Sequence, residues 1–399
     1  MCKSNCGFLV FVVIFACLSS ALGAEPAKIP DPLAPWLTGL NIHPVTDQPN
    51  RHTIHSYYVT SPESPDGKWV LFYTSTARTA EEEGEIHIRE RATGVEKVLA
   101  RHITTEDAHR AACQQWISGG RRVAYHDVRD GHWVVAVVDV DTGAERVLAR
   151  DHQIGFGTPA GDVVPIYGPH WNPGEHRDIE LLNVDTGKIT TAVTAAAVKE
   201  KYGDWVNKSF AGQPISLFFP VLSPDQKRMF FKIASARDGS TFRSAKASLR
   251  LGLIAFDVEG SRFLLLRQKW GHPAWATDSH TVVEPGGVIV DTNDDSSRTT
   301  PGLPRFRGDH PSFSPDMQLI VTDTTLDNFG GKETEWGVIL IRASDGKHEF
   351  IHKADNSHGA SSWRPSHPHP AWSPDGRRLY FNVNSSGWTQ LFVAELGKQ

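Results

Sequence analysis

The chain has 399 residues, 22% of them charged and 39% hydrophobic, with a formal net charge of −5. This is the composition of an ordinary globular protein, which speaks against a disordered or fibrous chain. The sequence has no basic patch or polybasic run, and this argues against nucleic acid as a partner.

The first 23 residues have the pattern of a secretory signal peptide. Lys3 gives a positive start, Gly7 to Ala16 is an unbroken apolar run, and residues 21–23 offer small side chains for cleavage. The apolar run is too short for a comfortable transmembrane helix, and no later stretch could span a bilayer. We therefore expect export to the periplasm or the extracellular space, with lipidation at Cys17 as the alternative.

The cysteine content is consistent with this reading. Cys2, Cys6 and Cys17 all lie in the signal peptide, so the mature chain retains only Cys113. No intramolecular disulfide is then expected, which an exported protein of this size tolerates. The simplest interpretation of Cys113 is a small buried apolar residue.

A proline-rich leader segment occupies residues 24–50, and the predicted folded domain extends over residues 51–399. This domain consists of short β-like runs separated by recurring turns. Near copies of Ser-Pro-Asp-Gly begin at residues 64, 223, 314 and 373, and weaker copies begin at 118, 158 and 277. Each turn precedes an apolar run such as KWVLFYTS. A second turn type, at 92–94, 141–143, 185–187, 258–260 and 344–346, is predicted to join the outer two strands of a unit.

Seven units with about four short strands each are typical of an all-β, seven-bladed β-propeller. Closing the ring removes sheet edges from solvent. A β-sandwich with long loops is the competing interpretation. Residues 194–204 (TAAAVKEKYGD) have a helix-like composition and fall within the longest gap between turns.

Histidines occupy equivalent positions in the last three units. His272, His310 and His369 each lie three residues before the aromatic residue that precedes the turn. In a propeller, these positions surround one mouth of the central channel, and His367 adds a fourth imidazole. Pro368 and Pro370 favour an extended backbone here, so that both imidazoles would point to one face. Neutral imidazole is a common ligand of transition metals.

The sequence resembles the oligogalacturonate lyase family and the related ulvan-lyase-like propellers. The resemblance rests on SYYVTSPESPDGKWVLF, FFPVLSPDQKRMFF, GHPAWATD, DHPSFSPDMQLIVTDT and HPHPAWSPDGRRLYF, and it covers most of the mature chain. It implies a seven-bladed propeller that holds a divalent transition metal, usually Mn²⁺. The resemblance also implies that His310, His367 and His369 are the metal ligands.

The same resemblance implies roles for residues around the metal. The family has a glutamine ligand where this chain has Arg364, and a guanidinium cannot bind a cation. Arg364 could instead bind a substrate carboxylate. His272 and Arg250 correspond to residues proposed to act in catalysis, with Arg243 as the alternative to Arg250. In the ulvan-lyase-like branch the candidates are His109, His126 and Tyr167.

The resulting hypothesis is a lyase that cleaves uronate-containing glycans, pectic or ulvan-like, by metal-assisted β-elimination. The base must take the proton at C5, and the metal or an arginine must neutralise the adjacent carboxylate. The expected oligomeric state is a monomer or dimer. The alternative is a non-catalytic, TolB-like periplasmic propeller that binds protein or glycan. A hydrolase with a separate catalytic domain is disfavoured, because the sequence has no nucleophile elbow.

Overall fold

The computed structural model describes residues 1, 30–76, 83–105, 110–236, 248–303, 309–359 and 367–397. The chain divides into Met1–Asp31 and Pro32–Gln399, and the fold below is that of the second unit. The body of the signal peptide, and with it Cys17, lies outside the described residues, as do His109, Arg243 and Arg364. Among the described helices, none has the length and apolar character needed to cross a membrane.

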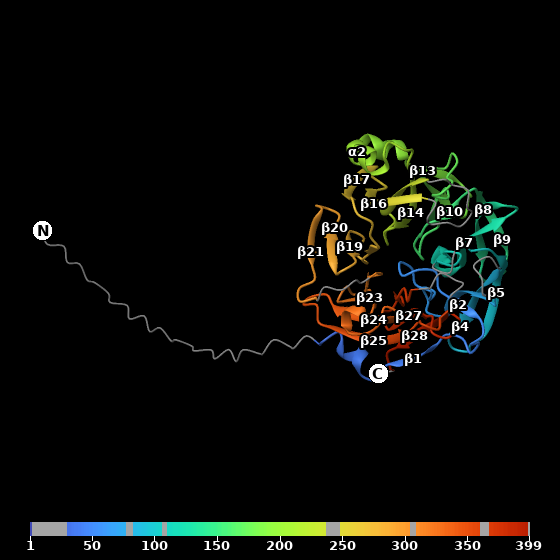
Figure 1. Cartoon of the computed structure of the whole chain (residues 1–399), viewed down its shortest axis with the longest axis vertical. Coiled ribbons are helices and arrows are strands. Elements are labelled where there is room, and N and C mark those ends of the chain that lie inside the picture. The colour runs from blue at the N-terminus through green and yellow to red at the C-terminus, as the bar shows by residue number, and fades with distance from the viewer. Residues whose placement is uncertain are drawn as a thin grey trace. The chain divides into compact units, whose positions relative to one another are not determined.

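The second unit is a seven-bladed β-propeller, as the sequence predicts. Its strands form seven four-stranded sheets, which Figure 1 shows arranged around a common centre. Neighbouring strands in each sheet are antiparallel, and the first strand of each blade is the innermost. Blades one to three comprise β2 (His52–Ile54), β3 (Trp69–Ser75), β4 (Gly84–Glu90), β5 (Glu96–Ile103); β6 (Gln115–Ile117), β7 (Arg122–Arg129), β8 (His132–Asp139), β9 (Glu145–Arg150); β10 (Gln153–Ile154), β11 (Val163–Tyr167), β12 (Ile179–Asn183) and β13 (Ile189–Val193).

The remaining blades follow the same plan. They comprise β14 (Ser216–Leu222), β15 (Arg228–Ala236), β16 (Ser248–Asp257), β17 (Arg262–Arg267); β18 (Ala274–Trp275), β19 (Thr281–Glu284), β20 (Val288–Asp291), β21 (Ser296–Thr299); β22 (Ser312–Phe313), β23 (Leu319–Thr325), β24 (Glu335–Arg342), β25 (His348–Asp355); β26 (Ala371–Trp372), β27 (Arg378–Val383) and β28 (Gln390–Glu395). All seven predicted turns lie between the first and second strands of a blade. The second turn type joins the third strand to the fourth.

The side chains of the Ser-Pro-Asp-Gly turns hold the chain reversal in place. In the first blade the Ser64 hydroxyl donates to Asp66, and Asp66 accepts the backbone N–H of Lys68 at 3.0 Å. Gly67 has a φ of 72°, a left-handed conformation that glycine adopts without steric cost. Three other blades repeat the Ser–Asp bond. The turn therefore fixes where each second strand begins, which fixes the position of the innermost strand beside it.

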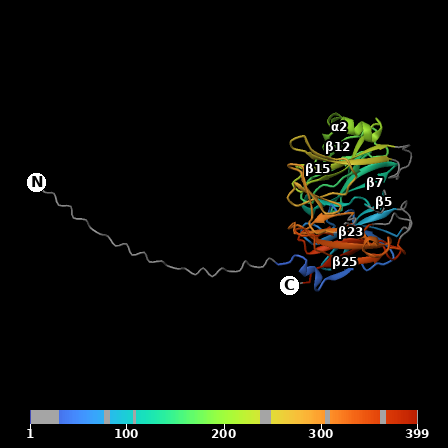
Figure 2. The ribbon, with the colours of Figure 1, turned by 60° about the vertical axis from the view of Figure 1, so that its left-hand side comes forward.

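In the part of the chain that the structure describes, helical structure consists of a few short segments and one longer helix. The predicted helix is present as α2 (Ala195–Phe210), which extends beyond the expected end. Its N-cap is Thr194, whose hydroxyl accepts the N–H of Ala197 at 3.0 Å. Figures 1 and 2 place α2 at the periphery of the propeller. The short helices are α1 (Ala34–Leu37), η1 (Ser118–Gly120) and η3 (Asp327–Phe329).

The ring closes by pairing the two ends of the propeller. Strand β1 (Asn41–Pro44) is antiparallel to β28 and completes the seventh sheet as its outermost strand. Residues 41–44, which the sequence analysis assigns to the leader segment, thus form part of the last blade. The segment has only four residues, Asn-Ile-His-Pro, which is too short for an alternation of polar and apolar residues to indicate a strand.

A buried ion pair joins the first blade to the seventh. The Arg378 guanidinium donates to both carboxylate oxygens of Glu63, at 2.7 and 2.8 Å. The Tyr380 hydroxyl also donates to this carboxylate, and the Glu63 side chain is only 1% exposed. Removing one member of a buried pair costs about 3–5 kcal/mol because the other charge stays buried; as a charged partner in the described chain, Glu63 would keep only the more distant Arg91, at 3.6 Å.

We expect the substitution Arg378→Leu to lower the free energy of unfolding by about 3 kcal/mol, because Glu63 would remain buried and charged. Chemical denaturation followed by tryptophan fluorescence measures this change. The control is Arg262→Leu, which removes a pair with Asp257 from a side chain that is 68% exposed; its expected effect is below about 1 kcal/mol. Equal effects of the two substitutions would contradict a closing role for Arg378.

Candidate functional site

Three blades place a histidine at the same mouth of the central channel. His272, His310 and His369 each precede an innermost strand by two residues, β18, β22 and β26 respectively. The ring centres of His272 and His310 are 4.7 Å apart, and those of His310 and His369 are 4.3 Å apart. The structure therefore brings together imidazoles that are separated by 38 to 97 residues along the chain.

His367 completes a cluster that has the donor set of a metal site. Nitrogen atoms of His310, His367 and His369 all lie within 4.8 Å of one another. His310 and His369 are fully buried, and His367 is partly exposed next to Trp336, with ring centres 4.4 Å apart. Three imidazoles are a suitable donor set for a divalent transition metal.

A buried carboxylate orients two of these histidines. Asp323, on β23, accepts the Nδ1–H of His310 at 3.0 Å from both of its oxygens. It also accepts the backbone N–H groups of His310 at 3.1 Å and of His369 at 3.0 Å. The bond to Nδ1 directs Nε2 of His310 toward a ligand, which is the carboxylate–histidine arrangement common in metal sites.

Electrostatics keep Asp323 ionised despite its burial. Burial alone would raise the pKa of this carboxyl, but the charge and hydrogen bond of His310 hold the pKa below its usual range. The sequence analysis did not single out Asp323. A signal was present, because a carboxylate within the apolar run LIVTDTT is expected to be buried with a partner.

The backbone at His369 differs from the extended conformation predicted for the His-Pro-His segment. His369 has a φ of 46°, in the left-handed region that side chains other than glycine rarely adopt. Two hydrogen bonds stabilise this conformation: Asp323 accepts its N–H, and His55 Nε2–H donates to its carbonyl at 2.6 Å. The two imidazoles therefore converge through a backbone turn, and such local strain is often found at functional sites.

Two tyrosine rings pack against the histidines. The Tyr57 ring is 4.7 Å from that of His369, and the Tyr58 ring is 5.0 Å from that of His310. The Tyr58 hydroxyl donates to the carbonyl of Pro273 at 2.8 Å. Both rings are buried and form part of the apolar surroundings of the histidine cluster.

Cations from two other blades border the cluster; Lys232 is buried, whereas Arg250 and Arg110 are partly exposed. Lys232 on β15 lies 3.9 Å from the Trp270 ring centre and 4.8 Å from that of Phe219. The guanidinium of Arg250, on β16, lies 5.0 Å from the same Trp270 ring. Arg110 lies 5.1 Å from Phe219. Cation–π contacts of this kind hold positive charges in an apolar setting.

Burial, together with the neighbouring cations, shifts the protonation of the site. Burial lowers the pKa of Lys232 well below its usual range, and the charges of Arg250 and Arg110 lower it further. Burial likewise lowers the pKa of His272, and Lys232 contributes to the same shift. Perturbed groups of this kind concentrate at functional sites. The sequence analysis identified Arg250 and His272 but missed Lys232. The signal for a buried cation was a lysine within the apolar run RMFFKIAS.

Two candidates drawn from the ulvan-lyase-like branch, Tyr167 and His126, lie near Arg110. Arg110 donates to the Tyr167 hydroxyl at 3.3 Å. His126, on β7, is fully buried, and its Nδ1 accepts the backbone N–H of Ile154 at 3.3 Å. Burial lowers the pKa of His126 well below its usual range, with a further contribution from Arg110.

Cys113 is fully buried, as its simplest interpretation predicts.

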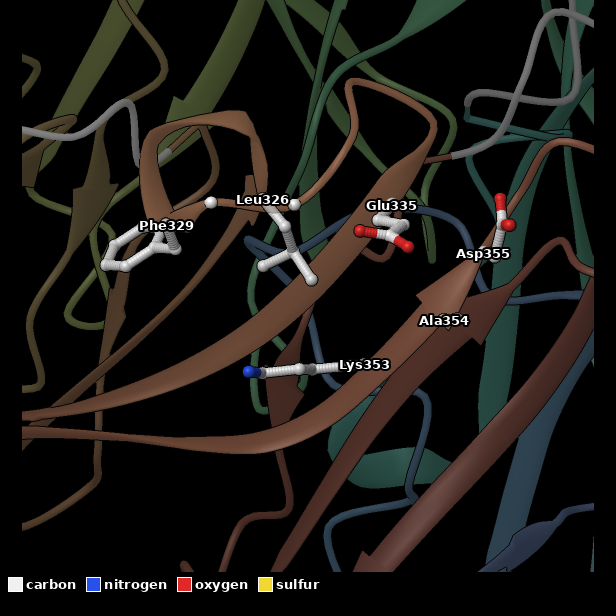
Figure 3. Close-up of a pocket in the computed structure, with 8 residues that line it drawn as sticks. Leu326, Phe329, Glu335, Lys353, Ala354 and Asp355 are labelled. Carbon is white, nitrogen blue, oxygen red and sulfur yellow. The ribbon is translucent and has the colours of Figure 1, made fainter.

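Two of the cavities lined by described residues lie outside the histidine cluster. One, of about 410 Å³, is at the turn end of the channel and is lined by residues of six blades, among them Tyr58, Trp275 and Trp372. The other, of about 380 Å³, is in the sixth blade between Leu326, Phe329, Glu335 and Lys353 (Figure 3). Trp336 contacts His367, and successive strand residues point to opposite faces. The second cavity therefore faces away from the cluster.

Comparisons with solved structures agree with the architecture. An oligogalacturonate lyase in complex with manganese superposes with a TM-score of 0.61 at 15% identity, over 90% of this chain and 93% of that one. The oligogalacturonate lyase from Vibrio parahaemolyticus gives 0.61 at 13% identity, over 90% and 97%. A chain of a mitotic checkpoint complex gives 0.51 at 12% identity, over 96% and 99%. No protein-family model and no curated protein sequence matches the chain. At these identities the likeness establishes the fold.

We expect the free energy of unfolding to fall as the pH drops below about 6.5, because buried His126 stays neutral in the folded state while the unfolded chain binds a proton there. The substitution His126→Gln should make this dependence shallower, by up to about 1.4 kcal/mol per pH unit. Denaturation at pH 5 to 7 measures the slope. The control, His102→Gln, alters an exposed histidine and should retain the wild-type slope.

Proposed function

We propose that this protein is an exported lyase that cleaves uronate-containing oligosaccharides or polysaccharides by β-elimination. The observation that carries the proposal is the juxtaposition of the His310–His367–His369 cluster with two cations, buried Lys232 and partly exposed Arg250, which both interact electrostatically with His272. A cluster suited to a metal, next to several positive charges, suits a carboxylate-bearing substrate. The fold shared with two oligogalacturonate lyases supports the same reaction class.

The residues present fit a divalent transition metal. His310 offers Nε2 because Asp323 accepts the proton of Nδ1. His367 and His369 supply two further imidazoles within 4.8 Å. The lyase solved with manganese makes Mn²⁺ the first ion to test. When bound, the metal would neutralise the uronate carboxylate and so acidify the neighbouring C–H group.

The protein's own groups would supply the remaining chemistry. Arg250 and Lys232 would attract and orient the anionic sugar, with Arg364 as a further carboxylate-binding candidate. His272 or Arg250 would take the proton from C5. The electron pair of the broken C–H bond forms the C4–C5 double bond, and the glycosidic oxygen departs from C4.

A second candidate function is a non-catalytic propeller that binds a protein or peptide. The cavity of about 410 Å³ at the turn end of the channel favours it, because prolines and tryptophans from six blades line this cavity. In this case, substitutions at Trp275 or Trp372 would weaken partner binding, whereas substitutions at the histidine cluster would not.

We expect His272→Ala and Arg250→Ala each to lower turnover by about 10²–10⁴-fold, the usual contribution of a positioned acid or base. The readout is the ultraviolet absorbance of the unsaturated uronate product, with pectic and ulvan oligosaccharides as substrates. Compared with Arg250→Ala, the conservative change Arg250→Lys should restore substrate affinity, but not turnover, if Arg250 is the base. The control is Lys227→Ala in the same blade, because this side chain is 61% exposed. The proposal fails if the wild-type protein forms no unsaturated product from either substrate class with added Mn²⁺.

We expect Asp323→Asn to weaken Mn²⁺ binding by about 10–100-fold, because an amide holds the His310 tautomer and the His369 backbone less firmly than a carboxylate. Titration calorimetry of metal-free protein measures the affinity directly. The control, Asp316→Asn, changes an exposed aspartate in the turn of the same blade and should bind Mn²⁺ as the wild type does. Unchanged affinity in Asp323→Asn would argue against a supporting role for this carboxylate.

A further inference from the structure

A second group of metal-binding side chains lies in the third blade, across the ring from the sixth and seventh. His152 immediately precedes β10, His176 lies between β11 and β12, and Glu180 is on β12. One potential ligand atom from each lies within 4.8 Å of the others. The ring centres of His152 and His176 are 4.1 Å apart. Two imidazoles and a carboxylate form a donor set that proteins use for zinc.

The hydrogen bonds of His152 indicate a place for a cation. Its Nδ1–H donates to the backbone carbonyl of Arg150, which is the outer contact that usually fixes the tautomer of a metal-bound histidine. Its Nε2 lies 2.7 Å from Oε2 of Glu180. When the proton of the neutral ring is on Nδ1, the lone pair of Nε2 points at the Glu180 carboxylate. Nε2 and Oε2 are then both hydrogen-bond acceptors, and they repel each other unless a proton or a metal ion lies between them.

The backbone around His176 holds this residue close to β11. The Gly168 N–H donates to the His176 carbonyl at 3.1 Å. A Cβ added at Gly168 would lie 2.2 Å from that carbonyl oxygen and 2.8 Å from the His176 Cβ. Only glycine therefore permits this approach, and the close packing holds His176 next to Glu180, with 3.9 Å between Nδ1 and Oε2.

The three side chains differ in solvent exposure in a way that suits entry of an ion. The side chain of His152 is 5% exposed, whereas those of Glu180 and His176 are 21% and 38% exposed. One side of the group thus reaches solvent, so an ion could enter and retain water as a fourth ligand. Asp151, which also interacts electrostatically with His176, adds negative charge nearby.

We propose that His152, His176 and Glu180 form a second metal site that binds Zn²⁺. It differs from the histidine cluster of the channel in position and in its carboxylate ligand. A bound ion would link the connection between blades two and three to the third strand of blade three. The site is therefore structural in character, and it does not depend on the proposed lyase activity.

The test is a zinc titration of metal-free protein in a His367→Ala background, in which the channel cluster lacks one ligand. We expect one strong equivalent of Zn²⁺ by calorimetry. Adding His176→Ala or Glu180→Gln should weaken its binding more than tenfold. Adding Gly168→Ala, which removes no ligand, should also weaken binding because it displaces His176.

The matched control is His280→Ala, which removes a histidine that lies 3.4 and 3.5 Å from two carboxylates without forming such a group. It should leave zinc binding unchanged. Circular dichroism of each metal-free variant establishes that it is folded. The proposal is overturned if folded His176→Ala and Glu180→Gln variants bind zinc as the parent does, or if His280→Ala weakens binding equally.

Discussion

The closure of the ring is the constraint on which the rest of the structure depends. Strand β1 pairs with β28, and the Glu63 carboxylate binds Arg378 across the same junction. Because each blade packs only on its neighbours, the angle between blades is set once the first and seventh are joined. Every innermost strand then begins at the same mouth of the channel, and residues equivalent in the repeat become neighbours in space.

This geometry explains how short motifs produce a site. A His-Pro before a strand places one imidazole at the mouth, and three consecutive blades repeat it. One carboxylate serves two blades. Asp323 lies on the strand next to β22 and binds both His310 and the backbone N–H of His369. The fourth blade contributes Lys232 and Arg250, which face the cluster from the other side. The site is thus divided between a histidine-rich half and a cationic half.

The left-handed backbone of His369 shows how tertiary contacts override local preference. The prolines on either side favour an extended chain, and the sequence analysis predicted that conformation on this basis. In the structure, Asp323 and His55 bind the N–H and the carbonyl of His369 from two other blades. These bonds, made by residues 46 and 314 positions away, stabilise a conformation that local preference disfavours.

The sequence by itself determined the seven repeats, the turn that begins each second strand and the alignment of His272, His310 and His369. These features are local, because turn chemistry and strand alternation depend on neighbouring residues. Only the tertiary structure decided that residues 41–44 complete the last blade, that Asp323 supports the histidines and that Lys232 faces them. It alone also brought His152, His176 and Glu180 together. Each of these depends on contacts between distant residues, and such contacts exist only once the ring has closed.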